Sequence, residues 1–429
     1  MWFGPCRERQ GNGDGELNGG IDEHEERELR WNHGKGDKKN MVIRTFHSVG
    51  QGAFYSERFY ENEHPEAKYN IVYDCGTSWG TVIKSKKVVT ESFDKKDVID
   101  YLFISHLDYD HLSLVLTLID CVKCVREIVL PLVQKDDIVI AIALNRISNH
   151  DDAADFLQMI ANHVGIDRKD EILKPLESEI VFVGSEEDNW ARNTKLWEDG
   201  ESRTIGNVPD WVLIPYNIKS QERKDELISE FSRILNDEKL LKKLGRCKIT
   251  LPAGGTELYE MLKNPNFVKE VVATRELKNA IKSAYEKVTG GVNANSLILY
   301  SGPASIQSDY WMETDCHHWC GCFETRRAGC LYTGDSNCDL PGWKVQRYTT
   351  VWNNIGTIQL PHHGSLASFD IVDNPIDRSY VFPVSCGSTN SYGHPSGKVL
   401  AYLTTKDCTP KIVTEMGSTV YMQRIVRER

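Results

Sequence analysis

Side chains that bind metal ions are concentrated in one short stretch, directly after an apolar run. Residues 105–111 contain two histidines and two aspartates, His106, Asp108, Asp110 and His111. They follow residues 101–104, Tyr-Leu-Phe-Ile, which predict a buried strand. A strand that ends in a sharp corner can aim several imidazole and carboxylate groups at one point, and these groups suit zinc, manganese or iron. The stretch therefore predicts a metal site, with a polar loop that binds no metal as the alternative.

Two later segments have the same character. A strand expected at residues 330–332 runs into Thr333-Gly334-Asp335, and a strand expected at residues 357–360 runs into His362-His363. Either segment alone could be an ordinary turn. Three strand ends that carry metal ligands in one chain argue for one shared site rather than for coincidence.

Bulk properties exclude several classes of protein. A net charge of −11 argues against a protein that grips nucleic acid over a broad surface, although it leaves room for a local basic groove. No stretch approaches the ~18 apolar residues of a membrane span, and the first residues lack the features of a secretory signal. We therefore expect a cytoplasmic protein without a membrane span.

The distribution of apolar residues divides the chain into three parts. Residues 1–40 are rich in Gly, Glu, Arg and Asn and predict a flexible leader. Residues 41–429 predict one folded domain, with strands at both ends of this range. Between them, residues of about 134–290 predict a large helical insertion, which we expect to cover the edge that carries the active site. Two runs of strands accompanied by helices fit an α/β fold of two packed sheets with helices outside.

The motifs in this order resemble the metallo-β-lactamase fold, and in particular the branch similar to the hydrolase domain of the DNA-uptake protein ComEC. The resemblance covers most of residues 41–404 and implies an αββα sandwich. Besides the three strand ends, it rests on four further segments: Val49-Gly50-Gln51-Gly52, Tyr73-Asp74-Cys75-Gly76, Asn293-Ala294-Asn295-Ser296-Leu297 and Asn390-Ser391-Tyr392-Gly393-His394-Pro395.

The resemblance also implies a role for each ligand. His106 and Asp108 would bind the first of two divalent ions, Asp110 and His111 would bind the second, and Asp335 would bridge them. One of His362 and His363 would complete the second site, and the choice between them stays open. Zinc is the expected metal and manganese the alternative. The two ions would hold a bridging hydroxide as the nucleophile.

The chain departs from the family pattern at two points that concern the ligands. Asp108 stands where the commoner motif has histidine, as is usual in the ComEC-like branch. No histidine stands at the mid-chain ligand position near residues 293–296. One metal would then be weakly held, or its shell would be completed by water or an asparagine such as Asn295.

Further residues are candidates for roles around the metals. His394 is a candidate general acid or donor to a substrate oxygen, with a turn histidine as the alternative. Ser365 and Asn390 are weaker candidates for substrate contacts. Gln51 and Asp74 are expected to orient the ligands rather than to take part in catalysis.

A cluster of cysteines and histidines precedes the Thr-Gly-Asp segment. Thiolate and imidazole at short spacings can form a structural zinc site, but only one residue separates Cys320 from Cys322, unlike the usual knuckle. Structural zinc, free thiols and redox pairing therefore all stay open for Cys316, His317, His318, Cys320, Cys322 and Cys330.

Three hypotheses for function follow. The first, based on the resemblance, is hydrolysis of a phosphodiester in nucleic acid or a nucleotide derivative. The second is an amide or ester hydrolase or a peptidase, because the same hydroxide attacks a carbonyl carbon. The third is a binding module with a vestigial metal site, whose helical insertion recognises a protein partner. Basic and aromatic residues near the site would favour the first hypothesis, and an apolar groove the second.

Overall fold

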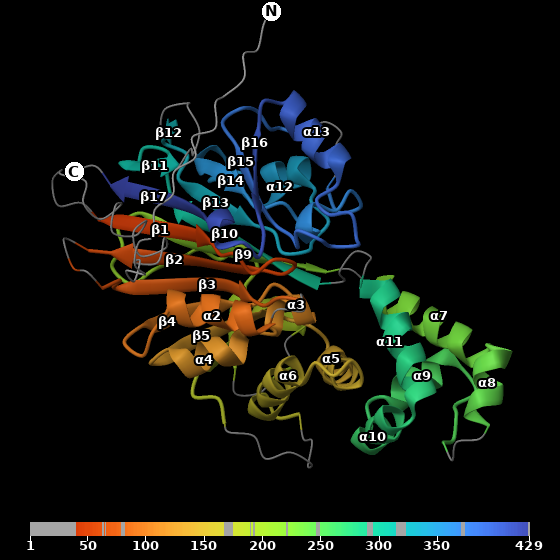
Figure 1. Cartoon of the computed structure of the whole chain (residues 1–429). Helices are drawn as coiled ribbons and strands as arrows, with labels where there is room; N and C mark the ends of the chain where they lie inside the picture. Colours follow the sequence, from red (N-terminus) through yellow and green to blue (C-terminus); the bar gives the residue numbers. More distant parts are fainter. Residues whose placement is uncertain are drawn as a thin grey trace, which may run out of the picture. The chain divides into compact units, whose positions relative to one another are not determined.

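Most central strands are buried on both faces, and this decides the layering of the computed structural model (Figure 1). In β3 (Tyr69–Cys75), Ile71 and Tyr73 belong to one apolar cluster, whereas Val72 belongs to another. Successive side chains of a strand point to opposite faces, so such a strand needs a covering layer on each side. The structure describes residues 40–61, 64, 66–78, 82–166, 175–188, 190–191, 194–219, 222–245, 249–289, 295–314, 323–369 and 374–427.

Two mixed sheets form the centre of the fold. In the described residues, the larger sheet has ten strands, in the order β12 (Phe323–Thr325), β11 (Tyr310–Thr314), β17 (Tyr421–Arg427), β1 (Met41–Phe46), β2 (Phe54–Tyr60), β3, β4 (Val98–Phe103), β5 (Cys124–Pro131), β6 (Glu179–Gly184) and β7 (Lys195–Glu198). The smaller has seven described strands, in the order β16 (Thr409–Val413), β15 (Val381–Ser385), β14 (Ile355–Ile358), β13 (Gly329–Tyr332), β10 (Asn295–Pro303), β9 (Trp211–Lys219) and β8 (Arg203–Thr204).

Each sheet has a parallel half and an antiparallel half. Strands β3 to β7 run parallel to one another in the larger sheet, and β13 to β16 do so in the smaller. Parallel neighbours end at the same edge of a sheet, and in open α/β sheets this edge is where sites form.

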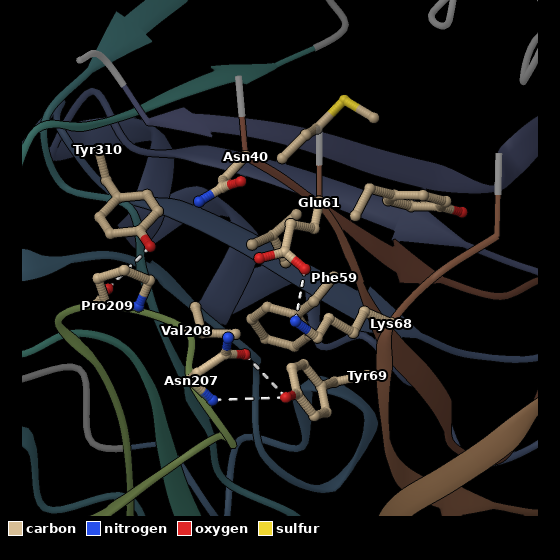
Figure 2. Close-up of a pocket in the computed structure, with 12 residues that line it drawn as sticks. Asn40, Phe59, Glu61, Lys68, Tyr69, Asn207, Val208, Pro209 and Tyr310 are labelled. Atoms are coloured by element: carbon tan, nitrogen blue, oxygen red, sulfur yellow. Dashed lines mark hydrogen bonds and ion pairs between the residues drawn. The ribbon is translucent and has the colours of Figure 1, made fainter. Parts of the chain in front are cut away.

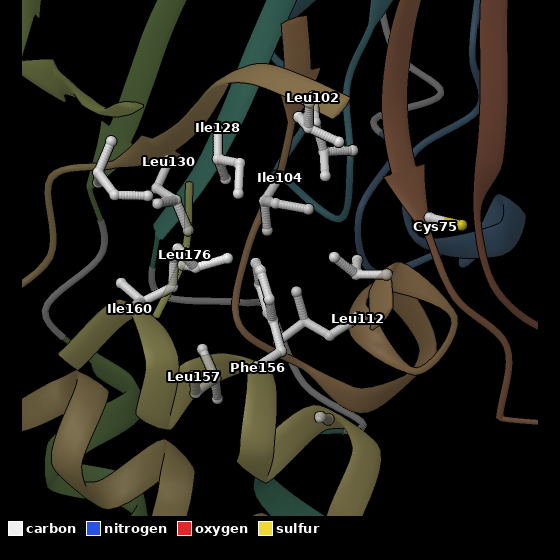
Figure 3. Packing of buried hydrophobic residues seen from close by; sticks show 14 of the residues in the cluster. Cys75, Leu102, Ile104, Leu112, Ile128, Leu130, Phe156, Leu157, Ile160 and Leu176 are labelled. Atoms are coloured by element: carbon white, nitrogen blue, oxygen red, sulfur yellow. The ribbon is translucent and has the colours of Figure 1, made fainter. Parts of the chain in front are cut away.

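Helices cover the outer faces of both sheets. On the larger sheet, Figure 3 shows Phe156, Leu157 and Ile160 packed towards Ile104 and Ile128. The helices on this face are α2 (Val82–Ser92), α4 (Val115–Cys121), α5 (Lys135–Ile147) and α6 (Asp151–His163). The smaller sheet is covered by α12 (Leu340–Gln346) and α13 (Gly397–Thr405). This layering confirms the predicted α/β fold class and is consistent with a metallo-β-lactamase-like sandwich.

The range 134–290 is less uniform than a helical insertion. It supplies α5 and α6, but also β6 and β7 to the larger sheet and β8 and β9 to the smaller. The part built only of helices comprises α7 (Glu222–Leu235), α8 (Glu238–Leu244), α9 (Gly255–Met261), α10 (Pro265–Ala273) and α11 (Arg275–Thr289). We call these five helices the helical segment; its apolar residues pack on Ile140, Ala143, Leu144 and Ile147 of α5.

The leader predicted at residues 1–40 lies outside the described residues except for Asn40. None of the described helices combines the length and the apolar character that crossing a bilayer requires.

A buried ion pair connects the two sheets. Arg44 of β1 and Glu57 of β2 are 0% and 1% exposed, and Arg44 Nε lies 2.7 Å from Glu57 Oε1. From the smaller sheet, Tyr332 Oη donates to Glu57 Oε1 at 3.0 Å and Ser301 Oγ donates to Oε2 at 2.5 Å. Arg44 donates in turn to the carbonyl oxygen of Ala328 at 3.1 Å. Both charges are therefore compensated inside the sandwich.

We expect Arg44→Met to lower the free energy of unfolding by about 3–5 kcal/mol, because it leaves Glu57 buried without its partner. Glu57→Gln should destabilise as well. The double variant should lose much less than the sum of both, since no unpaired charge remains. Urea unfolding of the four proteins measures the coupling; strictly additive losses would show that the pair contributes nothing.

Candidate metal centre

Strand ends from both sheets meet at one edge of the sandwich. β4 leads into His106, β13 into Asp335, and β14 into His362 and His363, which lie in the 3-10 turn η3 (His362–Gly364). Backbone hydrogen bonds join these ends: Leu297 N donates to Ser105 O at 2.7 Å, and His362 N donates to Gly334 O at 3.1 Å. The three segments that the sequence singled out are thus brought together.

Close backbone approach requires glycine at two of the turns. Gly334 has a φ of 53°, and a Cβ there would lie 2.4 Å from Ser296 Oγ and 2.7 Å from Ser105 Cβ. A Cβ at Gly76 would lie 2.5 Å from the carbonyl oxygen of Asp110. Larger residues would push the ligand loops apart at both positions.

Asp335 lies among three imidazoles. Its Oδ1 is 3.3 Å from His111 Nε2, and its Oδ2 is 3.8 Å from His106 Nε2 and also from His362 Nε2. Its carboxylate is buried, with 4% of the side chain exposed. This central position agrees with the bridging role implied by the resemblance, and that role stays a prediction.

The two remaining aspartates lie beside other histidines. Asp110 Oδ2 is 3.0 Å from His363 Nε2 and 3.9 Å from His111 Nε2. Asp108 Oδ2 is 3.7 Å from His106 Nε2. Both His362 and His363 therefore face a carboxylate of the centre, whereas the sequence led us to expect only one of them there.

Among the described residues, two groups of side chains could hold a metal ion, with ligand atoms within 4.8 Å of one another. One consists of His106, His111 and Asp335, and the other of Asp110, His111 and His363. His111 belongs to both groups. Its Nδ1 is engaged by Asp74 at 2.8 Å, so Nε2 alone remains and can serve one ion.

The outer hydrogen bonds of the histidines fix which nitrogen faces the centre. His363 Nδ1 donates to the carbonyl oxygen of Ser385 at 2.9 Å, and His111 Nδ1 donates to Asp74 Oδ2. Because a carbonyl or carboxylate oxygen can only accept, Nε2 of a neutral ring carries a lone pair. This lone pair points at a carboxylate oxygen in both cases, so a proton or a metal cation must lie between them.

The other two histidines are held similarly. Ser105 Oγ donates to Asp74 Oδ2 at 2.7 Å and lies 2.9 Å from His106 Nδ1. Since that hydroxyl proton is used, His106 Nδ1 is the donor to Oγ, and its Nε2 is left for the centre. His362 Nδ1 is hydrogen-bonded to Ser368 Oγ at 3.0 Å. Metal-binding histidines have outer partners of this kind, so the residues present fit a metal.

Without a metal, the buried charges compensate one another. Burial opposes ionisation of Asp335, but positively charged His111 and His362 hold the pKa of Asp335 well below its usual value. Burial likewise opposes charge on His111, and Asp335 and Asp74 nevertheless raise its pKa well above the usual value. Burial also opposes charge on His363, but its hydrogen bond with Asp110 raises the pKa of His363 above the usual value. The raised pKa values of His111 and His363 therefore favour protons at the positions where metal cations would bind.

The two histidines of η3 have an uncommon backbone. His362 and His363 have φ values of 47° and 54°, in the left-handed region that non-glycine residues rarely adopt. Such conformations cost about 1–3 kcal/mol each and cluster at functional sites. Here they turn two consecutive imidazoles towards the same centre.

Residues predicted to surround the metals have different positions. Asp74 orients His111 and also accepts from Ser105 N at 2.7 Å. Gln51 Oε1 accepts from Gly387 N at 3.2 Å, and Asn390 Nδ2 donates to the carbonyl oxygen of His394 at 2.6 Å. Ser365 Oγ accepts from Ala367 N at 3.3 Å in the turn after the two histidines. Asn295 begins β10, and its side chain lies outside the described part of the structure.

His394 lies beside the two histidines of η3. Its ring centroid is 5.4 Å from that of His362 and 6.4 Å from that of His363. Burial, together with the positive charges of His363 and His362, lowers the pKa of His394 to about 4. The ring is thus uncharged at neutral pH, which suits a hydrogen-bond donor to substrate better than a proton donor.

The cysteine cluster is mostly outside the described residues. Cys316, His317, His318, Cys320 and Cys322 all fall there. Cys330 lies in β13 within the core between the sheets, and burial raises the pKa of its thiol to about 12. A zinc site at this cluster stays a prediction.

Sequence analysis missed several residues that support the centre. Ser105 and Ser296 adjoin motif residues, so a search for outer partners could have found them. No sequence pattern marks Ser368 or Tyr285 as part of the centre. Tyr285 Oη donates to Asp108 Oδ1 at 2.9 Å, although the two residues are 177 positions apart in the sequence.

Cavities formed by the described residues lie away from the centre. One of about 30 Å³ is lined by Phe59, Tyr69, Val208 and Tyr310, as Figure 2 shows, and is too small for a substrate. Another, of about 380 Å³, lies between α10 and helices α5 and α6. Neither is lined by a residue of the centre.

Comparisons with known proteins give little guidance. No protein-family model matches the chain, and no curated protein matches its sequence. Among solved structures, a rubredoxin:oxygen oxidoreductase from the anaerobe Desulfovibrio gigas is similar over 87% of this chain and 91% of that chain, with 12% sequence identity and a TM-score of 0.20. At this identity and TM-score the likeness supports no inference about function.

We expect Asp74→Asn to lower metal affinity about 10–100-fold. Asp74 has a φ of 56°, which asparagine tolerates, so the backbone should be kept. The new amide can donate to His111 Nδ1, and this favours the tautomer with a proton on Nε2, which cannot bind metal. Metal analysis after dialysis measures the loss. The control is Asp100→Asn, a buried carboxylate that accepts from Asn70 N; equal affinities in both variants would contradict the role of Asp74.

Stability without metal should fall between pH 6.5 and 4. Burial and the nearby charge of Lys282 lower the pKa of His150 to about 4, from 6.5. The unfolded chain binds this proton first as the pH falls, so stability is complete above pH 6.5 and is lost towards pH 4. Urea unfolding of chelator-treated His150→Gln at pH 7 and 5 should show a smaller loss than the parent. An identical loss would exclude His150 as its source.

Proposed function

We propose that this chain is a metal-dependent hydrolase that cleaves phosphodiesters. One observation carries the proposal: Nε2 atoms of His111 and His363, fixed by their outer hydrogen bonds, face carboxylate oxygens of buried Asp335 and half-buried Asp110 at 3.3 and 3.0 Å. Either a proton or a metal cation must lie between these atoms, and two such positions that share His111 favour metal ions. Imidazole and carboxylate together favour zinc, with manganese as the alternative.

When bound, divalent ions supply the positive charge that lowers the pKa of a water molecule and stabilises the negative charge of the transition state. The chain contributes ligands, their orientation and a substrate contact. Asp74 and Ser105 orient His106 and His111, and uncharged His394 would donate a hydrogen bond to a substrate oxygen. The motif resemblance to the ComEC-like branch supports the same reaction class.

The surroundings of the centre favour a phosphodiester over a peptide. Tyr109 lies between Asp108 and Asp110, and its ring stacks on that of His150 with centroids 3.7 Å apart. The positive charge of Lys282 is close enough to lower the pKa of His150. On the other side, Tyr392 is 65% exposed and stacks against His394 at 6.0 Å. Basic and exposed aromatic groups suit an anionic substrate that carries rings.

The test is turnover of bis-p-nitrophenyl phosphate by the metal-loaded protein, beside an amide and an ester substrate. Cleavage of the amide alone would replace the proposed reaction by peptidase chemistry. Metal binding without turnover of any substrate would favour a binding module with a vestigial site.

We expect Asp335→Asn to lose bound metal, because it removes the charge at the middle of the three imidazoles. Turnover should then fall about a thousandfold, which corresponds to ~4 kcal/mol of transition-state stabilisation. The melting temperatures of Asp335→Asn and the parent should differ less in the presence of chelator than in the presence of metal, because only the parent is then stabilised by bound metal. Asp210→Asn is the control, since Asp210 pairs with Arg427 at the surface. Full metal content and full activity in Asp335→Asn would overturn the assignment.

A further inference from the structure

The helical segment contacts the candidate metal centre through the side chain of Tyr285. Tyr285 of α11 is buried, with 8% exposed, and its hydroxyl donates to Asp108 Oδ1 at 2.9 Å. The other oxygen of that carboxylate, Oδ2, lies 3.7 Å from His106 Nε2. The two oxygens of Asp108 are thus differentiated: one faces the helical segment and the other faces the centre.

We propose that Tyr285 is a positioning residue, which holds Asp108 so that Oδ2 is presented to the metal. The inference rests on the metal binding of the proposed function. Tyr285 does for this carboxylate what Asp74 and Ser385 do for the histidines, namely fix which atom is left for the centre.

The position of Tyr285 is set by packing remote from the centre. Leu277, Ile281, Ala284 and Val288 of α11 belong to the apolar cluster that includes Ala143 and Leu144 of α5. Lys278 Nζ also donates to Asn149 Oδ1 at 2.5 Å, beyond the end of α5. The helix is therefore fixed along its length, and its tyrosine is presented to Asp108 in a defined place.

Loss of the hydroxyl has two opposing effects on the carboxylate. A free Oδ1 carries more negative charge, which favours metal binding, but the side chain can then rotate and present either oxygen. Outer partners of metal ligands typically contribute 10–100-fold in affinity, so we expect the geometric effect to exceed the gain in charge.

The experiment is a cobalt(II) titration of chelator-treated protein. Calorimetry measures the affinity, and visible absorption reports the coordination of the bound ion. Tyr285→Phe should bind at least one ion about 10–100-fold more weakly and shift the absorption bands. Tyr259→Phe is the matched control, because Tyr259 lies in the same apolar cluster, away from the centre. This control should bind like the parent.

A double-mutant cycle with Asp108→Asn identifies the path of the effect. If Tyr285 acts through Asp108, adding Tyr285→Phe to Asp108→Asn should change affinity little further. Unchanged affinity and spectrum in Tyr285→Phe, or additive effects in the cycle, would overturn the inference. A parent that binds no cobalt would overturn this inference and the metal site together. A parent that binds cobalt but cleaves no phosphodiester would overturn only the proposed reaction.

Discussion

Burial of opposite charges at one edge of the sandwich is the constraint on which the rest of the site depends. Asp74 and Asp335 lie within 4 Å of His111, and all three are almost fully enclosed. Ionised groups in such surroundings are stable only with partners. The left-handed backbone of His362 and His363 adds a further cost. A cation held in common by these groups, as proposed above, would account for both the burial and the strain.

The site needs both sheets, so it depends on how they are joined. Asp74 lies near the end of β3 and His106 follows β4 in the larger sheet, whereas Asp335 and His362 follow β13 and β14 of the smaller. The Arg44–Glu57 pair connects these sheets inside the core through Tyr332, three residues before Asp335. Tyr73 Oη also bridges the layers by donating to the carbonyl oxygen of Leu297 at 2.5 Å. Interactions that hold the layers together therefore also hold the ligands in register.

Local patterns identified the candidate ligands that the structure brings together, because each set directly follows a strand that is recognisable by its apolar run. Outer partners were predictable only where they adjoin a motif, as Asp74 does. Tyr285 was not, because its contact depends on how α11 packs on α5. The range predicted to be a helical insertion also contains β6 and β9, which are integral strands of the two sheets. Pairing between strands distant in the chain leaves no local signal in a single sequence.

The electrostatics of the centre indicate that metal would serve binding as well as chemistry. Neighbouring positive imidazoles hold the pKa values of Asp110 and Asp335 below their usual value despite burial, so both carboxylates are ionised at neutral pH. In the metal-free protein, the raised pKa values of His111 and His363 favour protonated rings, whose positive charge is offset by the neighbouring carboxylates and offers little attraction for a phosphodiester anion. His394 adds none, since its pKa of about 4 keeps it uncharged. Divalent ions would displace those protons and bring more positive charge to the same place, so the affinity for an anionic substrate should appear only with the metal.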